Sequence, residues 1–227
     1  MNKPYVICHM YTSIDGKIDG NYMNEEGCNI SGDYYDEKIF KVGTSMASGR
    51  VTTKLYKAKE KENLENYRAF ENQEDYIIES EHYNFIFDRM GKCFYKDSIY
   101  SYGGKNMQIV EVVSSKCDRR YFSYLRSIKI SYIIADSIEE ALDKIYTKFK
   151  VKKLVLTGGA IINGGFLLEN MIDEISLIVA PYIEGNDAFK QCVGSMNKFV
   201  NQKFIFDKAI PLLDGGVDLT FKKLNGN

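Results

Sequence analysis

The sequence predicts an α/β fold: a mixed, mostly parallel sheet with helices on both faces and an antiparallel pair of strands at the C-terminus. First, short apolar runs of strand length alternate along the chain with stretches of helical periodicity, which is typical of parallel strands joined by helices. Second, Ser137–Lys150 carries an apolar stripe at helical spacing that begins with a capping box, Ser137 followed by Glu140. Third, the last two strands, near Phe204–Phe206 and Val217–Lys222, are separated by a short glycine-rich turn, so we expect them to be antiparallel.

The first half of the chain contains the less regular elements. An apolar run predicts a strand at Tyr5–Met10, and the stretch Ser13–Asn29, rich in Gly, Asn and Asp, predicts a loop. We expect a helix at Asp33–Ala47 and a short strand at Phe85–Phe87. The highly charged stretch Lys54–Glu81 is interpreted as a helix with an exposed excursion, inserted into a single domain.

The second half alternates more clearly between strands and helices. A turn is expected at Tyr100–Lys105 and a helix at Cys117–Ser127. The run Ile175–Ala180 is apolar at nearly every position, which predicts a strand buried on both faces. Three further strands are expected at Ile109–Val113, Ile130–Ala135 and Lys153–Leu156.

The composition is that of one globular domain, residues 1–227, with an apolar fraction of 44% and a net charge of −1. This charge balance favours neither nucleic acid nor a membrane surface as a partner. The five cysteines form no CxxC pair and the chain has two histidines, so we expect no metal site. The chain begins as a strand rather than as an export signal, and no apolar run approaches the ~20 residues of a membrane helix. We therefore expect a cytoplasmic protein with reduced thiols.

The stretch Leu154–Gly185 is the most informative for function. An apolar strand runs directly into Thr157-Gly158-Gly159-Ala160, and a short helix follows. Glycines that deliver a strand to the start of a helix expose backbone N–H groups, which with the helix dipole form a site suited to phosphate. The alternative is a simple tight turn, because the pattern is neither the dinucleotide fingerprint nor a P-loop.

Several motifs together resemble the reductase domain of bifunctional riboflavin-biosynthesis deaminase–reductases, in the dihydrofolate-reductase-like superfamily. The matching segments follow the order of that family along the chain. They are Pro4–Met10 leading into Ser13-Ile14-Asp15-Gly16-Lys17-Ile18, Met46–Thr52 with its Gly-Arg-x-Thr pattern, the Gly-Gly loop Leu154–Ala160, the helix Asn163–Leu168, and the run from Asp173-Glu174 through Ala180-Pro181 to Gly185.

The resemblance implies a dihydrofolate-reductase-like fold and an NADPH-dependent reductase, usually a homodimer, that acts on a pyrimidine or pteridine-like heterocycle. The deaminase half is missing, since no His-x-Glu with a Pro-Cys-x-x-Cys partner is present; a stand-alone reductase is known in the family. Two positions depart from the family pattern. Thr157 stands where a Glu usually precedes the Gly-Gly pair, and His9 stands where the first strand often carries Lys.

The candidate catalytic residues are His9, Ser13 and Asp15. Hydride transfer to an imine or carbonyl also needs a proton, which a carboxyl group or a water molecule supplies. Asp15 has the alternative role of capping its own Asp-Gly turn, and His9 that of a hydrogen-bonded core histidine.

The candidate cofactor residues lie at strand ends. Arg50 offers a forked donor for the 2′-phosphate of NADPH, although a surface Arg beside a helix-capping Thr is the alternative. Asp88 is interpreted as a ribose contact or, preferably, a turn cap. The cofactor set that the resemblance implies is Gly49, Arg50, Thr52, Ser114, Thr157, Gly158, Gly159, Ala160 and Ile161. Two functions fit these residues: the NADPH-dependent reductase, or a non-catalytic nucleotide-binding or ligand-sensing protein on the same fold.

Overall fold

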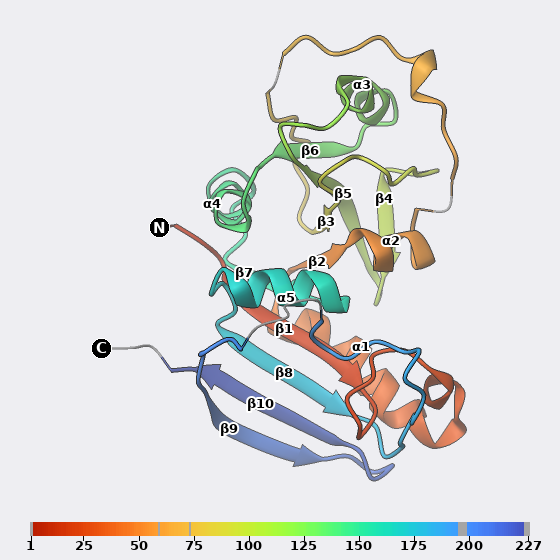
Figure 1. The fold of residues 1–227 in the computed structure, drawn as a ribbon, viewed down its shortest axis with the longest axis vertical. Helices are drawn as coiled ribbons and strands as arrows, with labels where there is room; N and C mark the ends of the chain where they lie inside the picture. Colours follow the sequence, from red (N-terminus) through yellow and green to blue (C-terminus); the bar gives the residue numbers. More distant parts are fainter. Residues whose placement is uncertain (1, 59, 73, 195–198, 225–227) are drawn as a thin grey trace. The chain divides into compact units, whose positions relative to one another are not determined.

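The computed structural model describes residues 2–58, 60–72, 74–194 and 199–224. It divides into two compact units (Figure 1). The terminal unit contains Tyr5–Gly43 and Lys153–Asn227, and the central unit contains Met1–Pro4 and Thr44–Lys152. The expectation of a single domain stays a prediction, and each unit is described by itself. None of the helices in the described part of the chain combines the length and apolar character needed to cross a membrane.

The terminal unit contains a five-stranded mixed sheet in the order β7-β1-β8-β10-β9. β1 runs parallel to β7 and β8, whereas β10 runs antiparallel to both β8 and β9. The antiparallel C-terminal pair is thus confirmed. The strand bounds are Tyr5–Thr12 for β1, Lys153–Leu156 for β7, Glu174–Val179 for β8, Phe204–Pro211 for β9 and Val217–Lys223 for β10.

Helices cover both faces of this sheet, as expected. Neighbouring residues of a strand point to opposite faces. His9 of β1 hydrogen-bonds the backbone of α1 (Asn29–Val42), while Met10 contacts Asn163 of α5 (Ala160–Leu168). The two helices therefore lie on opposite sides of β1, and Figure 1 shows both beside this strand.

The helix expected at Asp33–Ala47 is wrong at both ends. α1 begins at Asn29, after two single-turn 3₁₀ helices at Asn21–Asn24 and Glu26–Cys28, and it ends at Val42. Gly43 then adopts an extended conformation, and a Cβ atom there would lie 2.6 Å from the Val155 side chain. Glycine therefore lets the chain leave the helix close to β7, which helical periodicity alone does not reveal.

The expectation that Ile175–Ala180 is buried on both faces is also wrong for β8. Ser176 and Ile178 are fully buried, whereas the alternate residues Ile175, Leu177 and Val179 are half-buried. On β10, Leu219 is paired with Leu177 and is half-buried too. One face of this part of the sheet is therefore apolar and partly open to solvent.

The central unit has its own mixed sheet, in the order β4-β5-β3-β2, with β6 also paired to β5. β2, β3, β5 and β6 are parallel, and β4 is antiparallel to β5. The turn expected at Tyr100–Lys105 is the tip of this β4–β5 hairpin. The strand bounds are Ser45–Gly49 for β2, Tyr83–Phe87 for β3, Ile99–Tyr102 for β4, Lys105–Val113 for β5 and Ser131–Ile134 for β6.

The helices of the central unit confirm the clearest sequence signal. α4 (Ile138–Phe149) starts after Ser137, whose hydroxyl accepts a hydrogen bond from the Glu140 amide at 3.0 Å. Within its expected apolar stripe, Ala141, Leu142 and Ile145 are fully buried, whereas Ile138 at the start is half-buried. α3 spans Arg119–Ser127 and α2 spans Arg50–Tyr56, and one 3₁₀ turn at Leu64–Asn66 follows in the charged stretch.

Candidate functional site

The glycine turn after β7 lies beside the middle of β1. β7 ends at Leu156, which is paired with Cys8, and α5 begins at Ala160. Gly158 has a positive φ of 88°, and a Cβ atom there would lie 2.9 Å from Cε of Met10. Both the backbone conformation and the close approach therefore favour glycine at this position. The peptide bond between Gly158 and Gly159 is cis.

The first turn of α5 is held by Asn163, which the sequence analysis placed only within the helix. Its amide nitrogen donates to the Cys192 carbonyl at 2.8 Å and contacts Met10 Sδ at 3.3 Å. Its backbone N–H donates to the Gly159 carbonyl, so Gly159 is the N-cap residue. In an α-helix the earlier N–H groups have no partner within the helix, and Ile161 in this first turn is exposed. The start of α5 thus has the backbone arrangement that binds phosphate.

Ser13 and Asp15 form one hydrogen-bonded unit just beyond the end of β1. The Ser13 hydroxyl donates to Asp15 Oδ1 at 2.6 Å and accepts from the Lys17 amide at 3.0 Å. The Asp15 carboxylate also accepts from the backbone N–H groups of Glu184 and Gly185, both at 3.0 Å. These donors, the Ser13 hydroxyl first, lower the pKa of Asp15 to about 2. Asp15 is therefore an ionised anchor between two loops rather than a poised proton donor.

His9 lies within β1, four residues before Ser13, and its hydrogen bonds go to other partners. Its side chain is fully buried, with Nδ1 2.9 Å from the Ser176 hydroxyl and Nε2 3.0 Å from the Tyr35 carbonyl. The ring also stacks on Tyr35, with centroids 4.5 Å apart. Burial lowers the pKa of His9 to about 4. These contacts correspond to the core-histidine alternative, on the face of β1 opposite to Met10 and Gly158.

In the central unit, the candidate cofactor residues follow the parallel strands β2 and β5, which lie on either side of β3, so they lie at the same end of its parallel strands. Gly49 ends β2, and exposed Arg50 begins α2. Ser114 follows β5, but its buried hydroxyl donates to the Arg89 carbonyl at 2.8 Å. Thr52 is half-buried, and the neighbouring Thr53 makes the hydroxyl bond to the Gly49 carbonyl. Arg50 thus has the most accessible side chain among the candidate cofactor residues of this unit.

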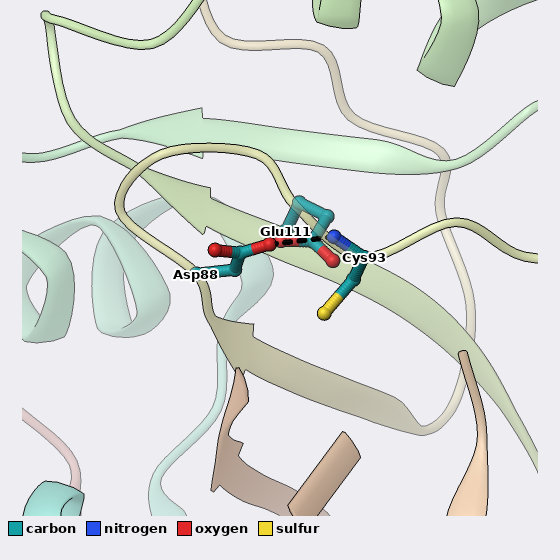
Figure 2. Close-up of side chains that lie close together, drawn as sticks. All are labelled: Asp88, Cys93 and Glu111. Carbon is teal, nitrogen blue, oxygen red and sulfur yellow. Dashed lines mark hydrogen bonds between the residues drawn. The ribbon is translucent and has the colours of Figure 1, made fainter. Parts of the chain in front are cut away.

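A buried acidic cluster in the same unit was not predicted. Figure 2 shows Asp88, Cys93 and Glu111 close together, with one atom of each side chain within 4.8 Å of the others. Asp88 Oδ2 accepts from the backbone N–H groups of Lys92 and of Cys93, the latter at 2.8 Å. Asp88 therefore caps the loop after β3, which confirms the preferred interpretation of this residue. No short motif in the sequence marks the cluster, because Asp88 and Cys93 lie in the loop after β3 and Glu111 lies on β5.

Glu111 carries most of the electrostatic cost of that cluster. Its side chain is fully buried, and one oxygen is bonded to the Tyr95 hydroxyl. The other oxygen, Oε2, has no hydrogen-bond partner among the described residues. Burial, with the nearby Asp88 carboxylate, raises the pKa of Glu111 well above its ordinary value. Burial thus favours the neutral form of Glu111 in the core of the central unit.

Comparison with solved structures places this arrangement in a known fold. RibD from Acinetobacter baumannii has a TM-score of 0.67 and 16% identity, over 99% of this chain and 59% of RibD. The riboflavin biosynthesis reductase Rib7 from Saccharomyces cerevisiae has a TM-score of 0.60 and 13% identity, over 99% of this chain and 91% of Rib7. Dihydrofolate reductase from Enterococcus faecalis, solved with NADP(H), has a TM-score of 0.51 and 10% identity, over 97% of each chain. These similarities confirm the dihydrofolate-reductase-like fold.

The sequence comparison identifies the family itself. No match was found among curated proteins. The family model described as the RibD C-terminal domain matches residues 4–208, which is most of the chain. The chain spans 59% of the length of A. baumannii RibD. This protein belongs to the RibD C-terminal domain family.

Proposed function

We propose that this protein is an NADPH-dependent reductase of a pyrimidine or pteridine-like heterocycle, of the riboflavin-pathway type. The observation that carries the proposal is the Gly158-Gly159 turn at the N-terminus of α5, in a chain that belongs to the RibD C-terminal domain family. The similarity to Rib7, a riboflavin biosynthesis reductase, supports the substrate class.

The glycine turn fits a dinucleotide phosphate. A Cβ atom at Gly158 would collide with Met10 and would fill the space where β7 passes into α5. We assign the phosphate contacts to the backbone of Thr157, Gly158, Gly159, Ala160 and Ile161. When bound there, NADPH supplies the hydride.

In the central unit, Arg50 is our proposed contact for the 2′-phosphate that distinguishes NADPH from NADH. Its side chain is exposed, and a guanidinium group binds phosphate through two parallel hydrogen bonds. Gly49, Thr52 and Ser114 stay in the proposed cofactor set as backbone contacts, since the Ser114 hydroxyl already bonds Arg89.

Ser13 and Asp15 are proposed to border the substrate. Because Asp15 is ionised over the neutral range, its role is to hold the Ser13 hydroxyl and the loop at Glu184 and Gly185 in place. The proton then comes from water bound at this pair, which is the second route that the sequence analysis left open. His9 has no direct part in this proposal, because its ring is fully buried on the face of β1 opposite to Met10 and Gly158.

We also propose a homodimer. The half-buried apolar residues of β8 and β10 form a continuous strip, with Leu177 opposite Leu219 and Ile175 opposite Phe221. Phe206 on β9 is 57% exposed and contacts Phe221. Stable dimers bury apolar strips of this kind. Light scattering should give twice the chain mass of 26.0 kDa, and a monomer would contradict the proposal.

Calorimetric titration with NADPH and NADH tests the cofactor assignment directly. We expect binding of NADPH with a preference over NADH, and loss of binding in Gly159→Val. Gly32→Ala serves as the control glycine variant, because Gly32 lies in α1 and an added Cβ atom there would meet nothing within 4 Å. Equal binding of the two cofactors would reject the assignment of Arg50. Unchanged binding by a folded Gly159→Val protein would reject the phosphate cradle.

The activity assay separates the reductase from its non-catalytic alternative. Thr157 in place of the family Glu favours that alternative. Oxidation of NADPH should follow the addition of a candidate pyrimidine, pterin or folate. Tight NADPH binding without oxidation by any of these compounds would favour the nucleotide-binding protein.

A further inference from the structure

Two of the five thiols lie in contact beside the glycine turn. Cys8 on β1 is 2% exposed, and Cys192 is half-buried. The two side chains interact with each other, and both thiols are free. The backbone supports this placement independently. Cys8 and Met10 point to the same face of β1, and the Asn163 amide joins Met10 Sδ to the Cys192 carbonyl.

Cys192 belongs to a segment, residues 186–194, that crosses this part of the terminal unit. Its ladder-like bonds join it to the turn after β1: the Cys192 amide donates to the Gly16 carbonyl at 3.1 Å, and the Lys190 carbonyl accepts from Ile18 at 3.0 Å. At its end, the Gly194 amide donates to the Ala160 carbonyl at 3.1 Å. A Cβ atom at Gly194 would lie 3.1 Å from that of Ala160. The segment thus rests directly on the first residue of α5.

We propose that Cys8 and Cys192 are an oxidisable pair that closes into an intrachain disulfide, and that this bond locks residues 186–194 against the start of α5. The pair has an asymmetry suited to the reaction, because Cys192 is the accessible thiol and Cys8 the enclosed one.

The reaction with hydrogen peroxide proceeds in two balanced steps. The Cys192 thiolate attacks a peroxide oxygen, the O–O bond breaks, and hydroxide leaves with the thiol proton as water, which gives a sulfenic acid. Cys8 sulfur then attacks the Cys192 sulfur, the S–O bond breaks, and a second water leaves with the Cys8 proton. Two thiols lose two electrons in total, and one peroxide is reduced to two waters.

Electrostatics supports the order of these steps. The hydrogen bond from Cys8 lowers the pKa of Cys192, while the same contact and burial raise the pKa of Cys8. The thiolate, which is the reactive form, is thereby favoured on the accessible residue.

The consequence for ligand binding rests on the proposed function. If phosphate binds at Gly158, Gly159 and Ala160, a segment fixed on Ala160 restricts the space at the same helix start. We therefore expect the oxidised protein to bind NADPH about tenfold more weakly than the reduced protein, with affinity restored by dithiothreitol.

Peptide mass spectrometry after peroxide treatment and alkylation tests the disulfide itself. The expected product is one linked peptide containing Cys8 and Cys192, lighter by two hydrogen atoms and separated by dithiothreitol. Cys192→Ser, a change at a half-buried position, should leave Cys8 unoxidised, whereas Cys28→Ser in the same unit should leave the linked peptide unchanged. Cys8 that stays alkylatable while Cys192 becomes a sulfinic acid would overturn the proposal.

NADPH titration of the same samples tests the locking separately. If oxidation weakens NADPH binding by the parent protein but not by Cys192→Ser, the result supports the proposal that the disulfide fixes residues 186–194. Equal binding by the oxidised and reduced proteins would overturn it. Absence of NADPH binding in both forms would instead reject the proposed function, and a linked peptide in that sample would still support the thiol pair.

Discussion

Each of the two compact units fully buries an ionisable side chain whose pKa is shifted by burial, and the two are of opposite kind. The terminal unit encloses a base, His9, whose pKa burial lowers to about 4. The central unit encloses an acid, Glu111, whose pKa burial raises well above its ordinary value. Burial is the largest cause of both shifts, because a low-dielectric interior disfavours the charged form of either group. The comparison shows that one physical cause gives the two units opposite responses to pH.

The two groups differ in how well their partners satisfy them. Both ring nitrogens of His9 have partners, Ser176 and the Tyr35 carbonyl. Glu111 has the Tyr95 hydroxyl at one oxygen, and its other oxygen has no hydrogen-bond partner among the described residues. A buried oxygen without a partner costs free energy. Of the two groups, Glu111 is therefore the greater liability to stability.

The largest effect is expected from Asp88→Ala, which removes the neighbouring charge and the loop cap of the central unit. It leaves the backbone N–H groups of Lys92 and Cys93 without their acceptor. One buried and one partly buried donor without partners should lower the free energy of unfolding by about 3 kcal/mol. Urea denaturation measures this loss.

Asp118→Ala is the matched control for Asp88→Ala. Asp118 is the partly exposed N-cap of α3 and accepts from the Arg120 amide at 2.9 Å. Its loss should cost about 1 kcal/mol, as for other helix caps. Equal losses in the two variants would show that water reaches the Asp88 loop and that the acidic cluster is not a closed core.

The next effect is the acid sensitivity that His9 gives to the terminal unit. Its folded pKa of about 4 lies below its ordinary value of 6.5, so the unfolded chain binds the extra proton more readily. Stability from this group is complete above pH 6.5 and falls as the pH drops toward 4, by about 3 kcal/mol in total. Urea midpoints measured between pH 7 and pH 4 should show this loss, and His9→Gln should flatten it.

His82→Gln is the control, because it removes the other histidine of the chain. His82 lies in the central unit, where Nδ1 is 3.0 Å from the Thr44 carbonyl. This variant should keep the acid-dependent loss. An NMR titration that gives His9 an ordinary pKa would contradict the enclosed position.

A smaller shift in the opposite direction is expected from Glu111. The folded state holds its proton more firmly than the unfolded chain, so stability from this group is greatest below the ordinary value of 4.5 and decreases as the pH rises toward the folded pKa. The Tyr95 hydroxyl bond lowers that pKa and so reduces the effect. Glu111→Gln, which cannot ionise, should gain stability relative to the parent as the pH increases. A constant difference from pH 5 to pH 9 would show that Glu111 is already charged in the fold.

These enclosed groups also mark how far the sequence predicts this molecule. Local patterns suffice for α4, because its cap and stripe both lie within Ser137–Lys150, and for the passage of β7 through Gly158 into α5. They predict the C-terminal hairpin for the same reason. The end of α1 and the half-open face of β8 depend on what packs against them from elsewhere in the chain, so periodicity gave the wrong result for both.

The candidate site divides in the same way. Asp15 as the cap of an Asp-Gly turn follows from adjacent residues, and the structure adds its bonds to Glu184 and Gly185, far along the chain. The residues next to His9 in the sequence do not reveal that its side chain is buried. Its partners on α1 and β8, which are distant in the sequence, enclose it. The Cys8–Cys192 contact joins residues near the two ends of the chain and has no signal in local sequence.

The smallest effect on stability, and the sharpest on function, is expected from Asp15→Asn. Asp15 provides a third case beside the two enclosed groups, since hydrogen bonds to the charged form lower its pKa to about 2 from 3.8. Its contribution to stability is therefore present above pH 3.8 and is lost as the pH falls through 2.

At neutral pH the amide that Asp15→Asn introduces would keep one acceptor oxygen but would turn its NH₂ group toward donors whose hydrogen bonds the carboxylate accepts. Turnover should fall about tenfold or more because the Ser13 hydroxyl and the loop at Glu184 lose their positions, while NADPH affinity at the Gly158-Gly159 turn should be unchanged. Asp19→Asn, in the same loop and bonded only to the adjacent Gly20 amide among the contacts described, should leave turnover intact. If the lower turnover of Asp15→Asn were accompanied by the loss of an ionisation near neutral pH in the rate profile, Asp15 would be the proton donor after all, and the anchor role argued from its three hydrogen bonds would be wrong.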